Sequence, residues 1–227
     1  MIDFVRTKEL YRHIPEYLKP LFCECEYPWQ ILPKIKDFIN LTIEKGIEGY
    51  TLFSEGILVG KNVKIYSNAT VEGPAIIGSK TEIRPGAFIR GSVIIGEECV
   101  IGNSTEIKNS VFFDRVQAPH YNYIGDSILG YKSHTGAGTI ASNLKSDQKN
   151  VVVRGEKEYF TELRKVGAFL GDGADVGCGV IMNPGTVVGN NTRVYPGISL
   201  RGVYPQSSIV KDTHTVVRQS CDEDTLP

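Results

Sequence analysis

The sequence predicts an all-β fold, a parallel β-helix built from hexapeptide repeats, and three observations support this prediction. Aliphatic residues recur at every sixth position in an unbroken series from Val59 to Ile107, and the series resumes from Leu170 to Leu200. A glycine often follows directly, as in "IIGSKT" and "VIGNST". Glycine is abundant, with 24 of the 227 residues, and tryptophan occurs once. This composition suits short strands joined by tight corners, where a positive φ angle favours glycine.

In such a fold three hexads close one triangular coil of about eighteen residues, and the coils stack. The aliphatic residue of each hexad points inward and stacks on its counterpart one coil away. Burial of each such side chain contributes roughly 1.5–3 kcal/mol. Because a solenoid buries its core only by stacking, we expect its ends to be capped.

The first 55 residues lack the repeat and form a separate N-terminal segment. Apolar residues are spaced by three and four within 7–18 and within 28–46, which predicts short amphipathic helices. Prolines break or start these helices, and Gly46 is a typical C-terminal stop. We expect this short helical segment, residues 1–55, to cap the first coil.

The predicted β-helix covers residues 56–211 and is interrupted twice. The register slips after Ile107, and the hexads are irregular as far as Gly138. A polar stretch without repeats then predicts an inserted loop over about 143–165, thrown out of the coil. Residues 212–227 are expected to form a polar, loosely ordered C-terminal tail.

The composition narrows the classes of partner. With 25 basic and 26 acidic residues, the net charge of −1 gives no general argument for nucleic acid or an anionic membrane. No run approaches the roughly 20 apolar residues of a membrane helix, and "MIDFVRTKEL" lacks the apolar core of a signal peptide. The five cysteines have no usual metal or redox spacing and are expected to be reduced thiols. We therefore expect a cytoplasmic protein without nucleic-acid or membrane partners.

Three motifs, "GNSTEIKNS", "APHYNYIGDSILG" and "GAGTIASN", occur in this order. They resemble the acetyltransferase domain of the bifunctional N-acetylglucosamine-1-phosphate uridyltransferase/glucosamine-1-phosphate acetyltransferase family, and the resemblance covers roughly Val59 to Pro205. It implies a left-handed parallel β-helix that forms a homotrimer, with active sites between neighbouring subunits. It also implies transfer of an acetyl group from acetyl-CoA, a co-substrate, to the amine of a hexosamine phosphate such as glucosamine-1-phosphate. The family's glycine-rich nucleotide loop has no match within 1–55, so nucleotidyl transfer is not expected.

The resemblance implies that His120 is the general base. A sugar ammonium must lose a proton before its nitrogen attacks a thioester, and imidazole titrates near neutral pH. The alternative is a histidine packed in an irregular corner of the coil. Asp126, in the "GD" corner, is expected to shape a turn rather than to orient the imidazole.

The resemblance also implies a clamp for the sugar phosphate. Lys108, twelve residues before His120, matches its lysine, and an arginine should stack one coil earlier. Arg84 lies in the family-like string "IRPG" but is 24 residues before Lys108, whereas Arg90 is 18 residues before it. Because stacking depends on full-coil spacing, we predict Arg90. Taken alone, each cation is equally consistent with a solvated face.

Further positions match the family's substrate and donor sites. Tyr123 and Asn143 are expected to contact the sugar, and Lys149 is expected to reach into the site from the loop. At Ala137 a backbone N–H group is expected to stabilise the oxyanion or hold the thioester, a contribution of roughly 10²–10³ in rate.

The sequence departs from the family at three positions. His134 stands where the family has asparagine at the sugar, and Leu144 replaces an aromatic residue. Asp172 occupies a position where a serine usually lines the thioester site, with Asn190 one coil away, and both are predicted to be cofactor-binding. These departures leave the acceptor sugar open. Further candidates for the CoA phosphates, matched by no motif, are Arg201, Lys211 and Arg218.

Other functions are compatible with the repeat. A non-catalytic β-helix could bind a sugar phosphate or serve as the trimerising subunit of a separate sugar nucleotidyltransferase. Fatty-acyl transferases of lipid A synthesis share the fold and a histidine base, but not this order of motifs. A zinc site like that of γ-class carbonic anhydrases needs three histidines, and only His120 and His134 lie in the helix, so no metal is predicted.

Overall fold

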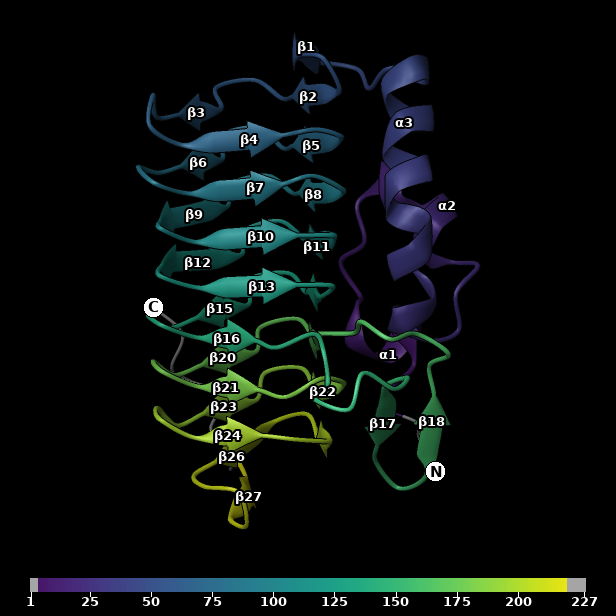
Figure 1. Cartoon of the computed structure of the whole chain (residues 1–227), viewed down its shortest axis with the longest axis vertical. Coiled ribbons are helices and arrows are strands. Elements are labelled where there is room, and N and C mark those ends of the chain that lie inside the picture. The colour runs from purple at the N-terminus through teal and green to yellow at the C-terminus, as the bar shows by residue number, and fades with distance from the viewer. Residues whose placement is uncertain (1–3, 220–227) are drawn as a thin grey trace.

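The computed structural model describes residues 4–219, and it shows a parallel β-helix with three sheets, named sheets A, B and C here (Figure 1). The chain visits them in the order C, A, B. It crosses sheet C at the front towards the side that carries the helices and returns behind on sheet B as it descends, so the coil is left-handed (Figure 1). The predicted fold class is confirmed.

Sheet A has nine strands, of which the first pair is antiparallel and the others are parallel. Its strands are β1 (Thr51–Ser54), β2 (Ile57–Val59), β5 (Ala75–Ile77), β8 (Val93–Ile95), β11 (Ser110–Phe112), β14 (Ile128–Leu129), β19 (Ala168–Leu170), β22 (Thr186–Val188) and β25 (Val203–Tyr204).

Sheet B also has nine strands, and its last pair is antiparallel. Its strands are β3 (Lys64–Ile65), β6 (Glu82–Ile83), β9 (Val100–Asn103), β12 (Gln117–His120), β15 (His134–Thr135), β20 (Asp175–Val176), β23 (Arg193–Val194), β26 (Ser208–Val210) and β27 (Val216–Arg218). Strand β27 gives order to part of the predicted tail, and residues 220–227 lie outside the described residues.

Sheet C has seven parallel strands and holds most of the predicted sugar-binding residues. Its strands are β4 (Thr70–Glu72), β7 (Phe88–Arg90), β10 (Glu106–Lys108), β13 (Tyr123–Gly125), β16 (Ile140–Ala141), β21 (Ile181–Met182) and β24 (Ser199–Leu200).

The core of the β-helix is the column of inward-pointing hexad residues. Nearly all of them, from Val59 to Val210, belong to one buried apolar cluster. The six-residue count shifts after Ile107, but the coils remain regular in the structure. Ile107 stacks below Ile89 with a coil of eighteen residues and above Ile124 with a coil of seventeen. The corner between sheets C and A is one residue shorter there, because Asn109 replaces the pair Gly91–Ser92.

The N-terminal segment covers the side of the coil stack, whereas we had expected it to cap the first coil (Figure 1). The outer face of sheet A is itself apolar, with Ile76, Ile94 and Val111 fully buried beneath the segment. This second apolar face explains the placement, since leaving it in water would forgo its burial. The helices are α1 (Thr7–Leu10), η1 (Glu16–Leu18), α2 (Lys19–Phe22), η2 (Pro28–Gln30), η3 (Leu32–Lys34) and α3 (Ile35–Lys45).

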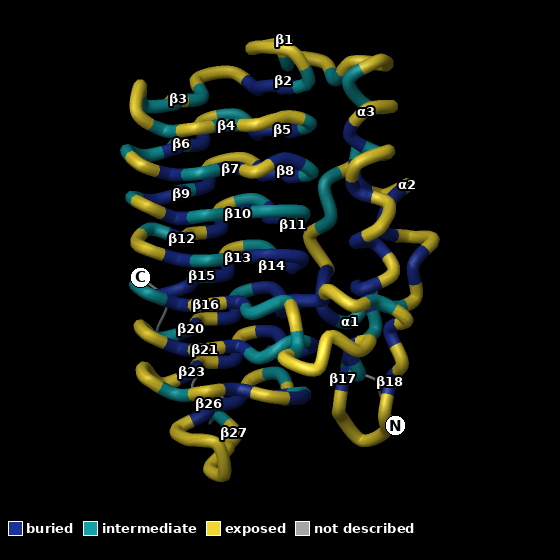
Figure 2. The backbone as a smooth tube through the Cα atoms, in the orientation of Figure 1, coloured by how far each residue is buried: buried dark blue, intermediate teal, exposed yellow. Residues whose placement is uncertain are grey.

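The insertion between β16 and β19 folds back onto the same face. It contains a hairpin of β17 (Val152–Arg154) and β18 (Glu158–Phe160), whose buried residues join the cluster beneath the N-terminal segment. Figure 2 shows the resulting contrast, with sheet A almost entirely buried except for β1, whereas sheet C has exposed and intermediate residues along its strands. Within residues 4–219, no helix is both long and apolar enough to span a membrane.

Candidate functional site

The candidate site lies on the outer face of sheet C and on the two corners that flank it. The B–C corner follows the strands of sheet B and carries His120, and the C–A corner follows the strands of sheet C and carries Lys108 and Asn143. Between the corners, the outward residues Glu106, Tyr123 and Ile140 occupy successive coils in one column.

His120 ends strand β12 and has an exposed side chain, so it is not a packed core histidine. Its register partner on the preceding coil is Asn103. Its carbonyl accepts a hydrogen bond from Gly138 at 3.1 Å, which ties it to the following coil. In the described part of the chain the imidazole has no hydrogen-bond partner, so both ring nitrogens are available to a substrate.

Ala137 lies directly beneath His120 on the B–C corner. Its carbonyl accepts a hydrogen bond from Gly179 at 2.8 Å. Within residues 4–219 its own N–H group makes no backbone hydrogen bond. A partly exposed, unsatisfied N–H donor one coil from an imidazole is suited to binding an oxygen that gains negative charge.

Tyr123 and Asn143 converge above Gly125. A Cβ atom added to Gly125 would lie 2.7 Å from Asn143 Nδ2 and 2.8 Å from Tyr123 Oη, so any larger residue here would displace these two side chains. Burial, followed by the charges of Asp126 and Glu106, raises the pKa of the Tyr123 phenol, and the neighbouring Asn143 amide offsets part of this effect. The structure thus brings two predicted sugar contacts together.

Asp126 positions this pair, a role beyond the turn expected from the sequence. Its backbone has a φ of 48°, as the turn requires, and its carboxylate is buried. One oxygen accepts a hydrogen bond from Asn109 Nδ2 at 2.8 Å, and the other accepts one from Asn143 Nδ2. Asn109, Asp126 and Asn143 occupy successive coils and are seventeen residues apart in the sequence. This spacing is the sequence feature from which their stacking could have been predicted.

Lys108 lies next to the pair, because it is the register partner of Gly125. Its ammonium has no ion-pair partner among residues 4–219. An unpaired cation beside two hydrogen-bonding side chains is suited to a phosphate or another anion.

Arg90 ends β7 and follows Ile89, the register partner of Ile107, so it stacks one coil before Lys108. Its guanidinium is held 2.7 Å from Glu106 Oε1, a pairing that the sequence did not reveal. Arg84 lies instead at the B–C corner and pairs with Glu82 at 3.0 Å. The geometry therefore places Arg90, and not Arg84, on the side of Lys108.

Two other predicted or noted residues lie apart from this group. Lys149 is exposed in the insertion and makes no contact with His120 or Lys108 within the described chain. His134 projects from sheet B, where its Nδ1 lies 2.8 Å from Asp175 Oδ1. This hydrogen bond lowers the pKa of Asp175.

Asp172 and Asn190, predicted to bind cofactor, lie on the A–B corner and hold the N-terminal segment. Asp172 accepts hydrogen bonds from the backbone of Arg12 at 2.9 Å and of Tyr131 at 2.9 Å. His13 Nδ1 lies 2.8 Å from the same carboxylate. Asn190 donates to the Glu9 carbonyl at 2.9 Å. Neither side chain projects from sheet C, so the structure gives both of them an anchoring role.

In the described residues, no three His, Cys, Asp or Glu side chains gather in a way that could hold a metal ion. The candidate site has an imidazole at one corner and a cation with two polar side chains at the other.

Comparison with known proteins gives a consistent picture. The family model described as the GMPPB C-terminal domain matches residues 71–157. The bifunctional protein GlmU of Methanococcus maripaludis strain S2 is 31% identical over 204 residues, which are 88% of this chain and 50% of that protein. GlmU of strain C7 is 37% identical over 196 residues, covering 81% of this chain and 46% of that protein.

Solved structures are more distant. A point mutant of perosamine N-acetyltransferase from Caulobacter crescentus, in complex with CoA and GDP-perosamine, is 19% identical, with a TM-score of 0.41 over 65% of this chain and 51% of that one. This likeness carries no argument about the site. The curated relatives are informative, although the chain spans only about half of their length. The resemblance that the three motifs predicted is confirmed, and the chain is similar to the bifunctional GlmU proteins over that half.

Proposed function

We propose that the chain is an acyl-CoA-dependent N-acetyltransferase that acts on the amine of a hexosamine phosphate, such as glucosamine-1-phosphate. The observation that carries the proposal is the exposed, unpartnered imidazole of His120, one coil above the free N–H group of Ala137. The similarity to the bifunctional GlmU proteins supports the same assignment.

In this mechanism His120 takes a proton from the sugar ammonium, and the freed nitrogen attacks the carbonyl carbon of the thioester. Formation of the C–N bond gives a tetrahedral adduct, whose nitrogen releases its second proton to water as the C–S bond breaks. The Ala137 N–H group stabilises the negative charge on the carbonyl oxygen, a contribution of roughly 10²–10³ in rate. The imidazolium then returns a proton to the departing thiolate, so that CoA leaves as a free thiol.

Across sheet C, we assign Lys108 to the sugar phosphate and Tyr123 and Asn143 to the sugar ring. Arg90 completes the clamp when its pairing with Glu106 opens or is shared with the phosphate. Lys149 and the second wall of the site come from neighbouring subunits of a homotrimer, because one exposed sheet face cannot by itself exclude water.

The test is a thiol-release assay with acetyl-CoA and a panel of amino-sugar phosphates and free amino sugars. We expect one acceptor to release CoA at a rate that His120→Ala lowers roughly 10²–10⁴-fold. Lys108→Gln should raise KM for a phosphorylated acceptor but not for the matching unphosphorylated sugar. Absence of CoA release with every sugar, alongside measurable sugar-phosphate binding, would instead indicate a non-catalytic sugar-phosphate-binding subunit.

A further inference from the structure

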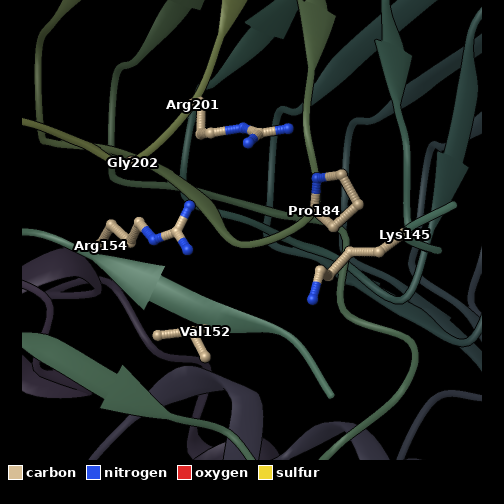
Figure 3. A pocket seen from close by; sticks show the side chains of 6 residues that line it. All are labelled: Lys145, Val152, Arg154, Pro184, Arg201 and Gly202. Carbon is tan, nitrogen blue, oxygen red and sulfur yellow. The ribbon is translucent and has the colours of Figure 1, made fainter. Parts of the chain in front are cut away.

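A small basic pocket of about 60 Å³ opens on the C–A corner, on later coils than the Tyr123–Asn143 pair (Figure 3). Its cations come from three segments: the start of the insertion (Lys145), the hairpin strand β17 (Arg154) and the corner after β24 (Arg201). The remaining lining residues are Val152, Pro184 and Gly202. Of the three unmatched candidates for CoA phosphates, only Arg201 lines it.

The pocket is built by close contact between the hairpin and the coil. At Gly202, with a φ of 93°, a Cβ atom would lie 2.7 Å from the Arg154 carbonyl oxygen. At Gly185, with a φ of 81°, it would lie 2.9 Å from a methyl group of Val151. Only glycine at these two corners lets β17 come near enough to place Arg154 beside Arg201.

The charges in the pocket are incompletely neutralised. Lys145 pairs with Asp147 at 3.2 Å and Arg154 with Glu158 at 3.5 Å, both as exposed pairs. Arg201 has no ion-pair partner in the part of the chain that the structure describes. Figure 3 shows the two guanidinium groups and the ammonium arranged around one opening. Of the three cations, only Arg201 lacks a carboxylate partner within the described chain, so an anion in the pocket would bind Arg201 and share Lys145 and Arg154 with their exposed partners.

The distance between the pocket and the reacting centre sets the length that a ligand needs to reach both. Arg201 follows Leu200, which stacks through Met182 on Ala141, so it lies two coils from the coil of Ala137. Neighbouring strands are about 4.8 Å apart, and the five residues across sheet C span at most about 16 Å. A group that reaches from the reacting centre at Ala137 to Arg201 is therefore on the order of 20 Å long. The extended arm that joins the thiol of CoA to its nucleotide has this order of length.

We propose that Lys145, Arg154 and Arg201 bind the phosphates of a nucleotide at the far end of a co-substrate whose reacting group lies at His120. This inference rests on the proposed function for the position of the reacting group at His120. The binding of phosphates rests only on the positive charge of the pocket. The same chemistry is offered by the nucleotide of CoA and by the nucleotide of a nucleotide-linked sugar acceptor. Planar guanidinium groups suit both, because they bind phosphate oxygens in pairs.

The experiment is calorimetric titration of the full chain with adenosine 3′,5′-bisphosphate, which represents CoA, and with uridine diphosphate, which represents a nucleotide-linked sugar. The test protein carries Arg154→Gln and Arg201→Gln, both at exposed side chains. The matched control is Arg193→Gln, an exposed arginine of sheet B outside the pocket. Far-ultraviolet circular dichroism and thermal melting establish that all three proteins are folded.

We expect at least one probe to bind the wild type and the control equally, and to bind the double variant at least about tenfold more weakly, since each charged hydrogen bond contributes about that much. The probe that responds identifies the source of the nucleotide. If neither probe binds the wild type, or if the double variant binds within about threefold of it, the inference is wrong. Because binding is measured without turnover, a failure of acetyl transfer leaves this result intact.

Discussion

Sheets A and C are built from the same coils, yet the outer face of sheet A is buried and the outer face of sheet C is accessible. On sheet A the outward residues, such as Ile94 and Phe169, are fully buried beneath the N-terminal segment and the hairpin. On sheet C the equivalent column contains Glu106, Tyr123 and Ile140, and it stays accessible. The repeat therefore determines the inward residues only. What covers each face depends on the outward residues, and the proposed site lies on the face that nothing in the described chain covers.

The largest effect on stability is expected on the covered face. Phe169 is fully buried and its ring lies 6.1 Å from that of Trp29. Phe169→Ala should lower the free energy of unfolding by about 3–5 kcal/mol, because it leaves a cavity between the coil and its cover. Urea denaturation measures this, with exposed Phe160→Ala as the control. A loss below about 1 kcal/mol would show that the segment is not packed on sheet A.

Asp172 was predicted from the sequence to bind cofactor, but in the structure it contacts the N-terminal segment that covers sheet A. A substitution at Asp172 separates these two roles. Asp172→Ala should lower the free energy of unfolding by about 1–3 kcal/mol, since it orphans the partly buried N–H groups of Arg12 and Tyr131. The KM for acetyl-CoA should not change. A raised KM with unchanged stability would support the cofactor-binding role that the sequence predicted for Asp172.

On the open face, Asn143→Ala should act on the acceptor rather than on stability. It removes the amide that donates a hydrogen bond to Asp126 and lies beside the Tyr123 hydroxyl, and we expect kcat/KM for the acceptor to fall about tenfold, with KM for acetyl-CoA unchanged. Asp126→Asn should have the same pattern at smaller magnitude, because Asp126 only orients Asn143. An equal rise in both KM values would argue against sugar binding by this pair.

The smallest effect is expected on sheet B, where His134 lowers the pKa of Asp175. A depressed carboxyl pKa contributes stability above the unfolded value, near 3.9, and the contribution disappears as the pH falls through the lower folded pKa. Asp175 is half exposed, so Asp175→Asn should cost less than about 1 kcal/mol at pH 5–7. Urea unfolding at several pH values tests this, and the difference should vanish near pH 2. A difference that grows towards acid would contradict it.

The sequence predicted the β-helix because inward residues obey one simple period, from Val59 to Ile107. It did not predict the regular seventeen-residue coils, because shortening a single corner at Asn109 shifts every later residue out of the count. The helical segment was recognised, but its place on sheet A depends on outward residues such as Ile76, which we had not considered as a second apolar face.

The candidate site was predictable to a similar extent. Full-coil spacing correctly placed Arg90 on the side of Lys108, and the motifs identified Tyr123 and Asn143, which the structure brings together. Side-chain pairing was not predictable. The Arg90–Glu106 ion pair and the Asp172 contacts join residues whose spatial proximity depends on the fold.

The most direct test of the account compares one histidine from each region, His120 beside the open face and His13 in the N-terminal segment that covers sheet A. Both are exposed at the imidazole, so neither substitution should prevent folding. In the thiol-release assay, His120→Ala should lose roughly 10²–10⁴ in turnover with an unchanged melting temperature. His13→Ala should keep its turnover while the melting temperature falls. Normal turnover in His120→Ala, with the acceptor and acetyl-CoA at saturation, would contradict the assignment of catalysis to sheet C.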